Sequence, residues 1–343
     1  MEIQIVNPID YPGWDDILLA TPGYTFFHSS AWSKIISESY QYTPKYFTIF
    51  GHGKFLALLP VMEVRSFLTG HRGVSLPFTD YCEPLLSEEV KFQAIYDYVV
   101  GYGREANWKF VEIRGGQSFF SNRLPSNSYF GHTLSLSGDV DKLFSSFKDN
   151  VRRNIKKAIK EGVEVRISNS LASIKEFYRL NCLTRKEHGL PPQPYYFFNK
   201  LHDTIYSNSG FVTLAFHNGQ CIAGAIYFHL GDKAIYKYGA SEKKYQHLRA
   251  NNLVMWEAIK WYCKNGYASL CFGRTDTGHQ GLRQFKAGWG AKEYAINYYK
   301  YDLKSNVFVI NRPAVGAFSN KVFSKMPLSL LNIFGSLLYR HMG

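Results

Sequence analysis

The chain lacks any hydrophobic run long enough to cross a membrane. Its most apolar stretch, residues 327–339, holds only 13 residues and includes Asn332 and two serines, whereas a spanning helix needs about 20. The first residues, MEIQIVNPIDYPGWDD, also lack the basic and apolar regions of a secretory signal. A membrane-spanning or exported protein is therefore not expected, and we predict a cytoplasmic location.

Cysteine is scarce, and its pattern excludes two site types. The five residues are odd in number, widely spaced and without a CxxC pair or matching histidines, which argues against a zinc site or a disulfide framework. They are expected to be small buried side chains of a reduced protein. The positions are Cys82, Cys182, Cys221, Cys263 and Cys271.

Acidic residues are few relative to basic ones. The 343 residues include 40 Lys and Arg against 27 Asp and Glu, which leaves a formal net charge of +13. Such an excess attracts anionic partners such as phosphorylated substrates, RNA or an acidic membrane face. Because 45% of the residues are hydrophobic, the chain can bury a sizeable core, and its length suggests two domains.

Two halves of the chain show the same order of strand, glycine turn, strand, helix and strand. The first half carries strands at 46–50, 55–64 and 109–113 and a helix at 88–105. The second carries strands at 211–216, 221–228, 233–238 and 268–272 and a helix at 253–265, with an Asn218-Gly219 hairpin signal. We predict an α/β (α+β) fold made by duplication, with domains at 1–145 and 146–303 and a tail at 304–343.

A basic helix is predicted at 141–161, beside the domain boundary. Its apolar stripe recurs every 3.6 residues and is flanked by two rows of cations with little acid nearby. The stripe comprises Phe147, Val151, Ile155 and Ala158, and the rows comprise Lys148, Arg152, Lys156 and Arg153, Lys157, Lys160. The cations form a candidate phosphate-binding surface; an ordinary solvated helix face is the alternative.

Two junctions in the second half could hold a ligand. In the loop 245–252, Arg249 precedes a helix start capped by Asn251 or Asn252, where free N–H groups and the helix dipole suit a phosphate. The loop lacks the glycines of the (R/Q)xxGx(G/A) pattern of acetyl-CoA-dependent N-acetyltransferases. The second junction, 273–290, starts at a strand end and would place Arg283 and Lys286 on one helix face.

Seven motifs along the chain together resemble the FemAB-like branch of the GNAT superfamily. They are FHSSAW at 27–32, VRRNIKKA at 151–158, Arg185 with HGLPP at 188–192, Tyr238-Gly239-Ala240, Asn252-Leu253 with Trp256-Glu257, Phe272-Gly273-Arg274, and GLxxFKxxWG at 281–290. The closing residues 325–343, from KMPLSL to the final glycine, resemble the subgroup associated with exosortase (PEP-CTERM) loci.

The resemblance implies two tandem GNAT-like acyltransferase domains with mixed central sheets, an active cleft between them, and a C-terminal domain similar to BioF2-like acetyltransferases. It implies transfer of an aminoacyl group from aminoacyl-tRNA to an amine of a peptidoglycan precursor, with no resident cofactor and no metal. It also implies that Lys286 contacts the anionic end of the acyl donor with Phe285 alongside. The chain has no coiled-coil insertion of the staphylococcal kind, so tRNA docking stays open.

Acyl transfer to an amine needs a neutral nucleophile, oxyanion stabilisation and a proton for the leaving group. Lys286 or Arg274 could stabilise the oxyanion or bind a donor phosphate, and Asp276 or His188 could move a proton. No Ser/His/Asp order or GxSxG motif is present, so direct transfer in a ternary complex is preferred over a covalent intermediate. The remaining candidate donor-binding residues are Tyr238, Arg185, Arg283, Arg249, Asn251, Asn252, Arg152, Arg153 and Lys156.

Three functions stay open at this point. The preferred one is an acyl- or aminoacyltransferase acting on an amine of a cell-envelope, peptidoglycan or surface-polysaccharide precursor. The alternatives are an acyl-CoA-dependent N-acetyltransferase and a non-enzymatic RNA- or polyanion-binding module. The tail 304–343 has five Lys and Arg and no acid, which fits either peripheral contact with an anionic membrane face or a helix docked on the core.

Overall fold

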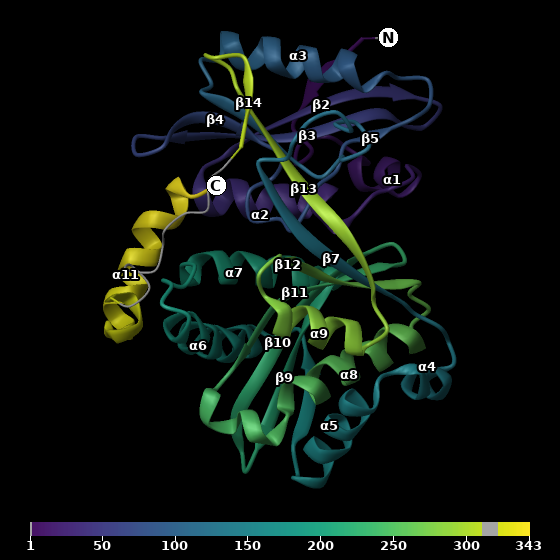
Figure 1. Ribbon diagram of the computed structural model, residues 1–343, viewed down its shortest axis with the longest axis vertical. Helices are drawn as coiled ribbons and strands as arrows, with labels where there is room; N and C mark the ends of the chain where they lie inside the picture. The colour runs from purple at the N-terminus through teal and green to yellow at the C-terminus, as the bar shows by residue number, and fades with distance from the viewer. Residues whose placement is uncertain (1, 311–321) are drawn as a thin grey trace. The chain divides into compact units, whose positions relative to one another are not determined.

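The computed structural model describes residues 2–310 and 322–343, which divide into two compact units. Among these residues, unit 1 comprises 2–129, 295–310 and 338–343, and unit 2 comprises 130–294 and 322–337. Figure 1 shows both units as sheets flanked by helices.

Unit 1 is built on a sheet in the order β1-β2-β3-β4-β6-β13. Neighbouring strands run antiparallel, except that β4 and β6 are parallel and are joined through helix α3. The strands are β1 (Gln4–Val6), β2 (Thr43–Gly51), β3 (Lys54–Ser66), β4 (Gly70–Val74), β5 (Leu85–Leu86), β6 (Phe110–Arg114), the end of β13 (Lys292–Asp302), and β14 (Val307–Val309). The helices are α1 (Trp14–Leu19), η1 (Phe26–His28), α2 (Ser30–Tyr40), α3 (Phe92–Glu105) and, near the end of the chain, η4 (Tyr339–His341).

Unit 2 repeats that order with β8, β9, β10, β11 and β12, of which only the β11–β12 pair is parallel. Its strands are β7 (Asn127–Ser135), β8 (Glu164–Ser168), β9 (Gly210–His217), β10 (Gln220–Leu230), β11 (Lys233–Ser241) and β12 (Ser269–Asp276). Its helices are α4 (Val140–Ser146), α5 (Asp149–Lys160), α6 (Leu171–Glu187), α7 (Tyr195–Thr204), η2 (Ile205–Ser209), η3 (Lys243–Leu248), α8 (Ala250–Lys264), α9 (Gln280–Gly288) and α11 (Leu328–Leu338). The same pairing pattern in both units confirms the predicted duplication of an α/β fold.

The first hairpin of each unit closes through two residues in the left-handed region. In unit 1 these are His52 and Gly53, and in unit 2 Asn218 and Gly219, all with φ between 50° and 75°. This backbone twist matches the twist of the flanking strands, and only glycine and asparagine-like residues adopt it at low cost. The hairpin predicted from Asn218-Gly219 is confirmed, since Gln220 pairs with His217.

The units do not follow the predicted boundaries at 145/146 and 303/304. Strand β7 begins in unit 1 and ends in unit 2, where it lies next to β12. Strand β13 begins in unit 2 and ends in unit 1, where it pairs with β6. The predicted tail is also divided, because 304–310 and 338–343 belong to unit 1 and 322–337 to unit 2. Residues 311–321 lie outside the described part.

The single helix predicted at 141–161 is wrong. Two helices, α4 and α5, are separated by Phe147 and Lys148, both with extended ψ angles near 150°. The Lys148 N–H donates to the carbonyl oxygen of Gly288, 2.9 Å away, and the Phe147 ring packs against Trp256 and Trp289. These distant partners override a local pattern that was continuous in the sequence.

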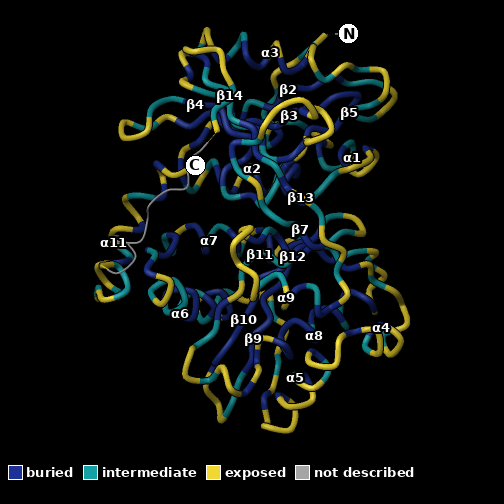
Figure 2. The backbone as a smooth tube through the Cα atoms, in the orientation of Figure 1, coloured by how far each residue is buried: buried dark blue, intermediate teal, exposed yellow. Residues whose placement is uncertain are grey.

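Each unit has its own hydrophobic core, visible as dark blue segments along the sheets in Figure 2. In unit 2 the core lies between the sheet and helices α5, α8 and α9, and includes Trp289, which is fully buried as predicted. The five cysteines are free and buried, which confirms that prediction. No helix in the described ranges is long and apolar enough to cross a membrane.

Candidate active site in unit 2

The parallel strands β11 and β12 separate at their carboxyl ends. Only three residue pairs join them, the last being Ile235 with Cys271, although the strands continue to Ser241 and Asp276. Gly273 has a φ of 69°, which bends β12 just beyond the last pair. Backbone groups that leave a sheet in this way are available to side chains and ligands, and open α/β sheets bind ligands at this end.

Lys286 from α9 lies at the end of β12. Its Nζ donates to the carbonyl oxygens of Gly273 and Arg274, at 3.0 and 3.1 Å, and only 4% of the residue is exposed. The neighbouring Phe285 packs against Trp289 and the core. Two carbonyl dipoles therefore hold a buried ammonium group where β12 leaves the sheet.

In unit 1 the corresponding opening is closed by the chain itself. Strands β4 and β6 share two residue pairs, and the segment 75–83 then runs alongside β6. The N–H groups of Ser75 and Cys82 donate to the carbonyl oxygens of Glu112 and Arg114, at 2.7 and 2.8 Å. Backbone N–H groups thus take, in unit 1, the role that the Lys286 side chain takes in unit 2.

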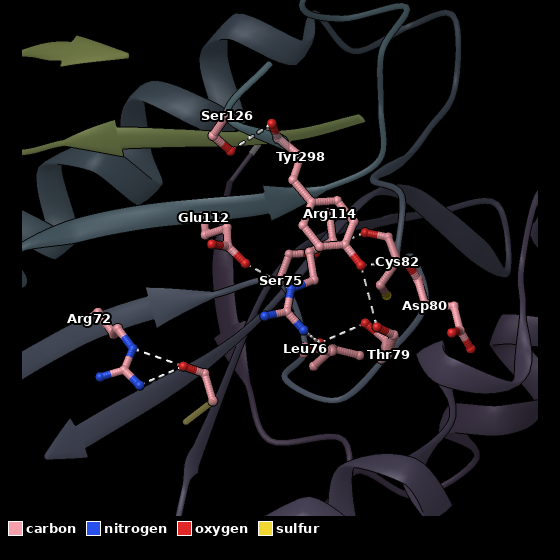
Figure 3. Close-up of polar contacts among 11 residues, drawn as sticks. Arg72, Ser75, Leu76, Thr79, Asp80, Cys82, Glu112, Arg114, Ser126 and Tyr298 are labelled. Atoms are coloured by element: carbon pink, nitrogen blue, oxygen red, sulfur yellow. Dashed lines mark hydrogen bonds and ion pairs between the residues drawn. The ribbon is translucent and has the colours of Figure 1, made fainter. Parts of the chain in front are cut away.

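Side chains reinforce this closure, as Figure 3 shows. Arg114 donates to Glu112 at 2.8 Å and to the carbonyl oxygen of Leu76 at 3.3 Å, and its guanidinium lies 5.3 Å from the centre of the Tyr298 ring. The Tyr298 hydroxyl donates to the carbonyl oxygen of Asp80 at 2.6 Å. The ends of the parallel strands in unit 1 are therefore bonded to other residues of the same unit.

A histidine and a glutamate that were not predicted from the sequence lie near Lys286. His132 on β7 is fully buried, and its Nε2 is 3.0 Å from a carboxylate oxygen of Glu293 on β13. Arg283 on α9 binds the same carboxylate with Nε and an Nη atom at 2.9 and 2.7 Å, and its guanidinium stacks on Phe130. Arg283 and Lys286 therefore share one face of α9, as predicted.

The charges of this cluster fix the state of the histidine. Burial and the Lys286 charge lower the pKa of His132, so that its imidazole is neutral at physiological pH. The hydrogen bonds from Arg283 lower the pKa of Glu293, which is therefore a carboxylate. Because a carboxylate only accepts, the hydrogen of His132 lies on Nε2 and Nδ1 carries the lone pair.

Besides Nε1 of Trp289, two buried polar atoms of this region have no hydrogen-bond partner among the described residues. They are Nδ1 of His132 and Oγ1 of Thr275, on the neighbouring strands β7 and β12. Leaving such atoms unpaired costs about 1–3 kcal/mol each. A ligand, an ordered water or a transferred proton can supply the missing partner of such an atom.

The other predicted proton carriers are both exposed. Asp276 is exposed just after the bend in β12. His188 is the exposed C-cap residue of α6, and its imidazole forms no hydrogen bond within the described ranges. Arg185 donates to the carbonyl oxygen of Pro191 at 3.3 Å and so shapes the adjoining loop.

At the predicted phosphate position, the expected helix cap is wrong: α8 begins at Ala250 instead of 253, and neither Asn251 nor Asn252 caps it. Arg249 is the N-cap residue, exposed and with a φ of 60°, and no side chain caps the helix. Asn251 instead donates to Ser241 at 3.0 Å, while Asn252 is buried. Tyr238 packs its ring against Phe197 and Phe198 of α7.

The basic helix α5 buries Val151, Ile155 and Ala158 as predicted. Arg152 forms an ion pair with Asp149 and donates to the carbonyl oxygen of Ser145. The other cations lie away from the buried stripe. Within the described residues, Arg153, Lys156 and Lys157 are exposed and have no ion-pair partner. No group of three or more His, Cys, Asp or Glu able to hold a metal occurs in the described ranges.

Comparison with known proteins agrees with this fold. Residues 145–294 match the model of the acetyltransferase (GNAT) domain. The solved structure of FemX aligns with 87% of the chain and 97% of its own length, at 13% identity and a TM-score of 0.69. Residues 145–294 are therefore similar to a GNAT domain, and the predicted GNAT-like α/β fold is confirmed.

Two curated relatives match part of the chain. The lipid II:glycine glycyltransferase of Staphylococcus epidermidis is 30% identical over 101 residues, which are 28% of this chain and 23% of that protein. The UDP-N-acetylmuramoylpentapeptide-lysine N(6)-alanyltransferase of Weissella viridescens is 23% identical over 103 residues, which are 30% of this chain and 31% of that protein. The matches thus span less than a third of either relative.

Proposed function

We propose that the protein is an acyl- or aminoacyltransferase of the FemAB type that transfers its group to an amine of a cell-envelope, peptidoglycan or surface-polysaccharide precursor. The observation that carries the proposal is the buried Lys286 ammonium at the carbonyl end of β12, with the neutral His132 beside it. The names of the two relatives, a glycyltransferase and an alanyltransferase acting on cell-wall precursors, support this reaction class.

In the proposed reaction the acceptor nitrogen attacks the carbonyl carbon of an ester or thioester donor. The bond from carbon to the leaving oxygen or sulfur breaks, the nitrogen loses a proton, and the leaving group gains one. Lys286 supplies positive charge for the oxyanion or the donor phosphate, and Arg274 stands next to it on β12. The lone pair on Nδ1 of His132 makes this residue a candidate proton acceptor in addition to Asp276 and His188.

Glu293 and Arg283 have a supporting role in this proposal. The Glu293 carboxylate fixes the His132 tautomer and would stabilise the imidazolium that forms when a proton arrives. Arg283 keeps that carboxylate charged and oriented by two hydrogen bonds. Enzymes commonly tune the pKa of a catalytic base through burial and neighbouring charged groups of this kind.

The donor is the least determined part of the proposal. Aminoacyl-tRNA fits the exposed cations of α5, because a polyanion can contact several of them at once. Acyl-CoA fits the uncapped N-terminus of α8 with Arg249, but the loop before it lacks the glycines that let backbone wrap a pyrophosphate. A non-enzymatic polyanion-binding module would use the α5 cations alone.

The proposal places the protein in the cytoplasm, with residues 304–343 contacting the inner face of the membrane. A lipid-linked acceptor would be within reach there. The resemblance of residues 325–343 to the exosortase-associated subgroup favours a surface polymer as the acceptor over the peptidoglycan precursors of the two relatives.

Purified protein incubated with one donor at a time tests the function. Aminoacyl-tRNA and acyl-CoA are offered separately, with a muramyl-pentapeptide and an amino-sugar polymer as acceptors, and products are identified by mass spectrometry. Transfer that is lost in Lys286→Met and retained in Lys264→Met, a change at an exposed lysine of α8, supports the proposal. Tight polyanion binding with no transfer from either donor favours the binding module instead.

A further inference from the structure

The hairpin between β3 and β4 in unit 1 presents two adjacent apolar side chains to solvent. Phe67 is 85% exposed and Leu68 57% exposed, at a loop that is drawn exposed in Figure 2. Single exposed apolar residues are common on protein surfaces. Two large neighbours at a hairpin tip suggest a surface that meets an apolar partner.

The end of the described chain is held against this hairpin. The His341 ring lies 4.6 Å from the Phe67 ring, and its Nδ1 is 2.9 Å from the hydroxyl of Ser66. The buried Arg72 donates from Nε to the backbone oxygen of Gly343 at 2.9 Å. Met342, which is 59% exposed, lies in the chain between these two held residues.

The two segments that carry this apolar group contain arginines and no acidic residue. We call Arg65, Phe67, Leu68, Arg340 and Met342 the hairpin patch. Both arginines are exposed, and neither 64–72 nor 338–343 contains an Asp or Glu. The nearest acid in sequence, at position 63, is buried beneath the Arg65 ion pair.

Helix α11 presents a second apolar surface, described within unit 2. Leu330, Ile333, Phe334 and Leu337 recur at helical spacing and are between 41% and 62% exposed. The opposite face docks on the protein, since Leu331 is fully buried and a Cβ on Gly335 would lie 2.0 Å from the backbone oxygen of Pro192. We call the four exposed residues the α11 stripe.

We propose that the hairpin patch and the α11 stripe are contact surfaces for an anionic lipid bilayer. Apolar side chains flanked by arginines and free of acids are what the headgroup region of such a bilayer attracts. In the chain, the α11 stripe is followed directly by residues 338–343, which include Arg340 and Met342 of the hairpin patch. A second copy of the protein is disfavoured as the occupant, because a symmetric contact through the patch would bring its arginines together.

This inference rests on the proposed function only in its purpose, which is to bring the enzyme to a lipid-linked acceptor. Binding to vesicles that contain no substrate requires no activity. A protein that binds vesicles but transfers nothing would leave the surface assignment standing and remove the proposed function. A protein that transfers its group to a soluble acceptor but does not bind vesicles would support the proposed function and remove the surface assignment.

Co-sedimentation of the full chain with vesicles tests the proposal. Vesicles of phosphatidylglycerol and phosphatidylcholine are compared with vesicles of phosphatidylcholine alone. We expect at least about tenfold stronger partitioning onto the anionic vesicles and its decline with salt. The double variants Phe67→Ser/Leu68→Ser and Ile333→Ser/Phe334→Ser should each lower partitioning about tenfold or more.

Two further variants complete the design. Arg65→Gln/Arg340→Gln should remove most of the preference for anionic vesicles while leaving the apolar residues in place. Leu124→Ser, at a residue of unit 1 that is 70% exposed and outside both surfaces, should leave partitioning unchanged. Equal thermal unfolding of all variants shows that the fold is intact.

The proposal is overturned if wild-type protein fails to bind anionic vesicles, or if Leu124→Ser weakens binding as much as the patch variants do. It is also overturned if light scattering shows a dimer that becomes monomeric in Phe67→Ser/Leu68→Ser. That result would assign the patch to a second copy of the chain.

Discussion

Nε2 of His132 lies 3.0 Å from a carboxylate oxygen of Glu293, although 161 residues separate them in the chain. One residue comes from β7 and the other from β13. Neither lies in a recognisable motif, and their contact depends on strands that the sequence does not predict to be near one another. The contact defines the protonation state of a buried base beside Lys286.

The stability of the protein should depend on pH through His132. Its pKa in the folded protein is lowered below the ordinary value of about 6.5, so the unfolded chain binds more protons just below that pH. The contribution of His132 to the free energy of unfolding should therefore be fully present above about pH 6.5 and should decline as the pH falls. Urea unfolding between pH 5 and 8 measures this slope, which should be shallower in His132→Phe.

A second histidine provides the control for this experiment. Burial also lowers the pKa of His229, whose Nε2 bonds to the carbonyl oxygen of Asn208 at 2.8 Å. His229→Phe should likewise make the stability slope shallower. Only His132→Phe should abolish the acidic limb of the pH profile for acyl transfer, and equal activity profiles for the two variants would remove His132 from the reaction.

Replacing Lys286 with methionine should affect both activity and stability. The carbonyl oxygens of Gly273 and Arg274 lose a donor, and an unsatisfied buried acceptor costs about 1–3 kcal/mol. If Lys286 also stabilises the oxyanion, transfer should fall by about 100-fold or more. Initial rates and urea unfolding are measured on the same preparations.

The conservative change Lys286→Arg separates the two effects. An arginine keeps the charge, but its planar fork does not reproduce the position of a single ammonium group. Stability close to wild type with activity still low would support a role in the reaction. Full activity in either variant would reduce Lys286 to a structural link between α9 and β12.

Changing Glu293 to glutamine should disturb the His132 tautomer without removing its hydrogen-bond partner. The amide can donate as well as accept, so Nδ1 is no longer held as the only acceptor. We expect kcat to fall at least tenfold with little change in KM. Arg166→Gln breaks an exposed pair with Glu164 on β8 and should have almost no effect, because such pairs contribute about 0–1 kcal/mol.

Local features of the fold were predictable, and long-range ones were not. Asn218-Gly219 predicts its hairpin because the turn conformation depends on those two residues alone. The break at Phe147 and Lys148 depends on a bond to Gly288, far along the chain. Periodicity carries no information about such partners, which is why one helix was predicted where two occur.

The same distinction applies to the site. Lys286 stood out because it follows a strand end and resembles a family motif, and the structure places it on the carbonyls of that strand. The carbonyl groups themselves have no sequence signature. His132 and Leu134 are both buried on β7. They are two residues apart and so lie on one face of the strand, a spacing that by itself does not identify a functional histidine.

Three of the unpaired cations of α5, namely Arg153, Lys156 and Lys157, should contribute to donor binding if the donor is tRNA. Arg153→Gln/Lys156→Gln/Lys157→Gln should weaken tRNA binding and reduce the slope of log K against log salt by about 0.7–0.9 for each phosphate that the variant no longer neutralises. Filter binding from 50 to 300 mM salt measures the slope. The matched variant changes Lys91, Lys264 and Lys304, three exposed lysines elsewhere, and an equal weakening there would reduce the effect to net charge.

Gly335 should determine whether α11 stays docked on unit 2. Replacing it with alanine raises helix propensity by about 1 kcal/mol, but the new Cβ would lie 2.0 Å from the backbone oxygen of Pro192. A backbone atom cannot move aside as a flexible side chain can, so the steric term of about 1–3 kcal/mol should prevail and release the helix. Hydrogen exchange across 328–338 should then be faster in Gly335→Ala. Ser336→Ala, at the exposed next position, gains the same kind of propensity without the clash and should exchange no faster than wild type; faster exchange in both would mean that docking does not depend on the close approach at Gly335.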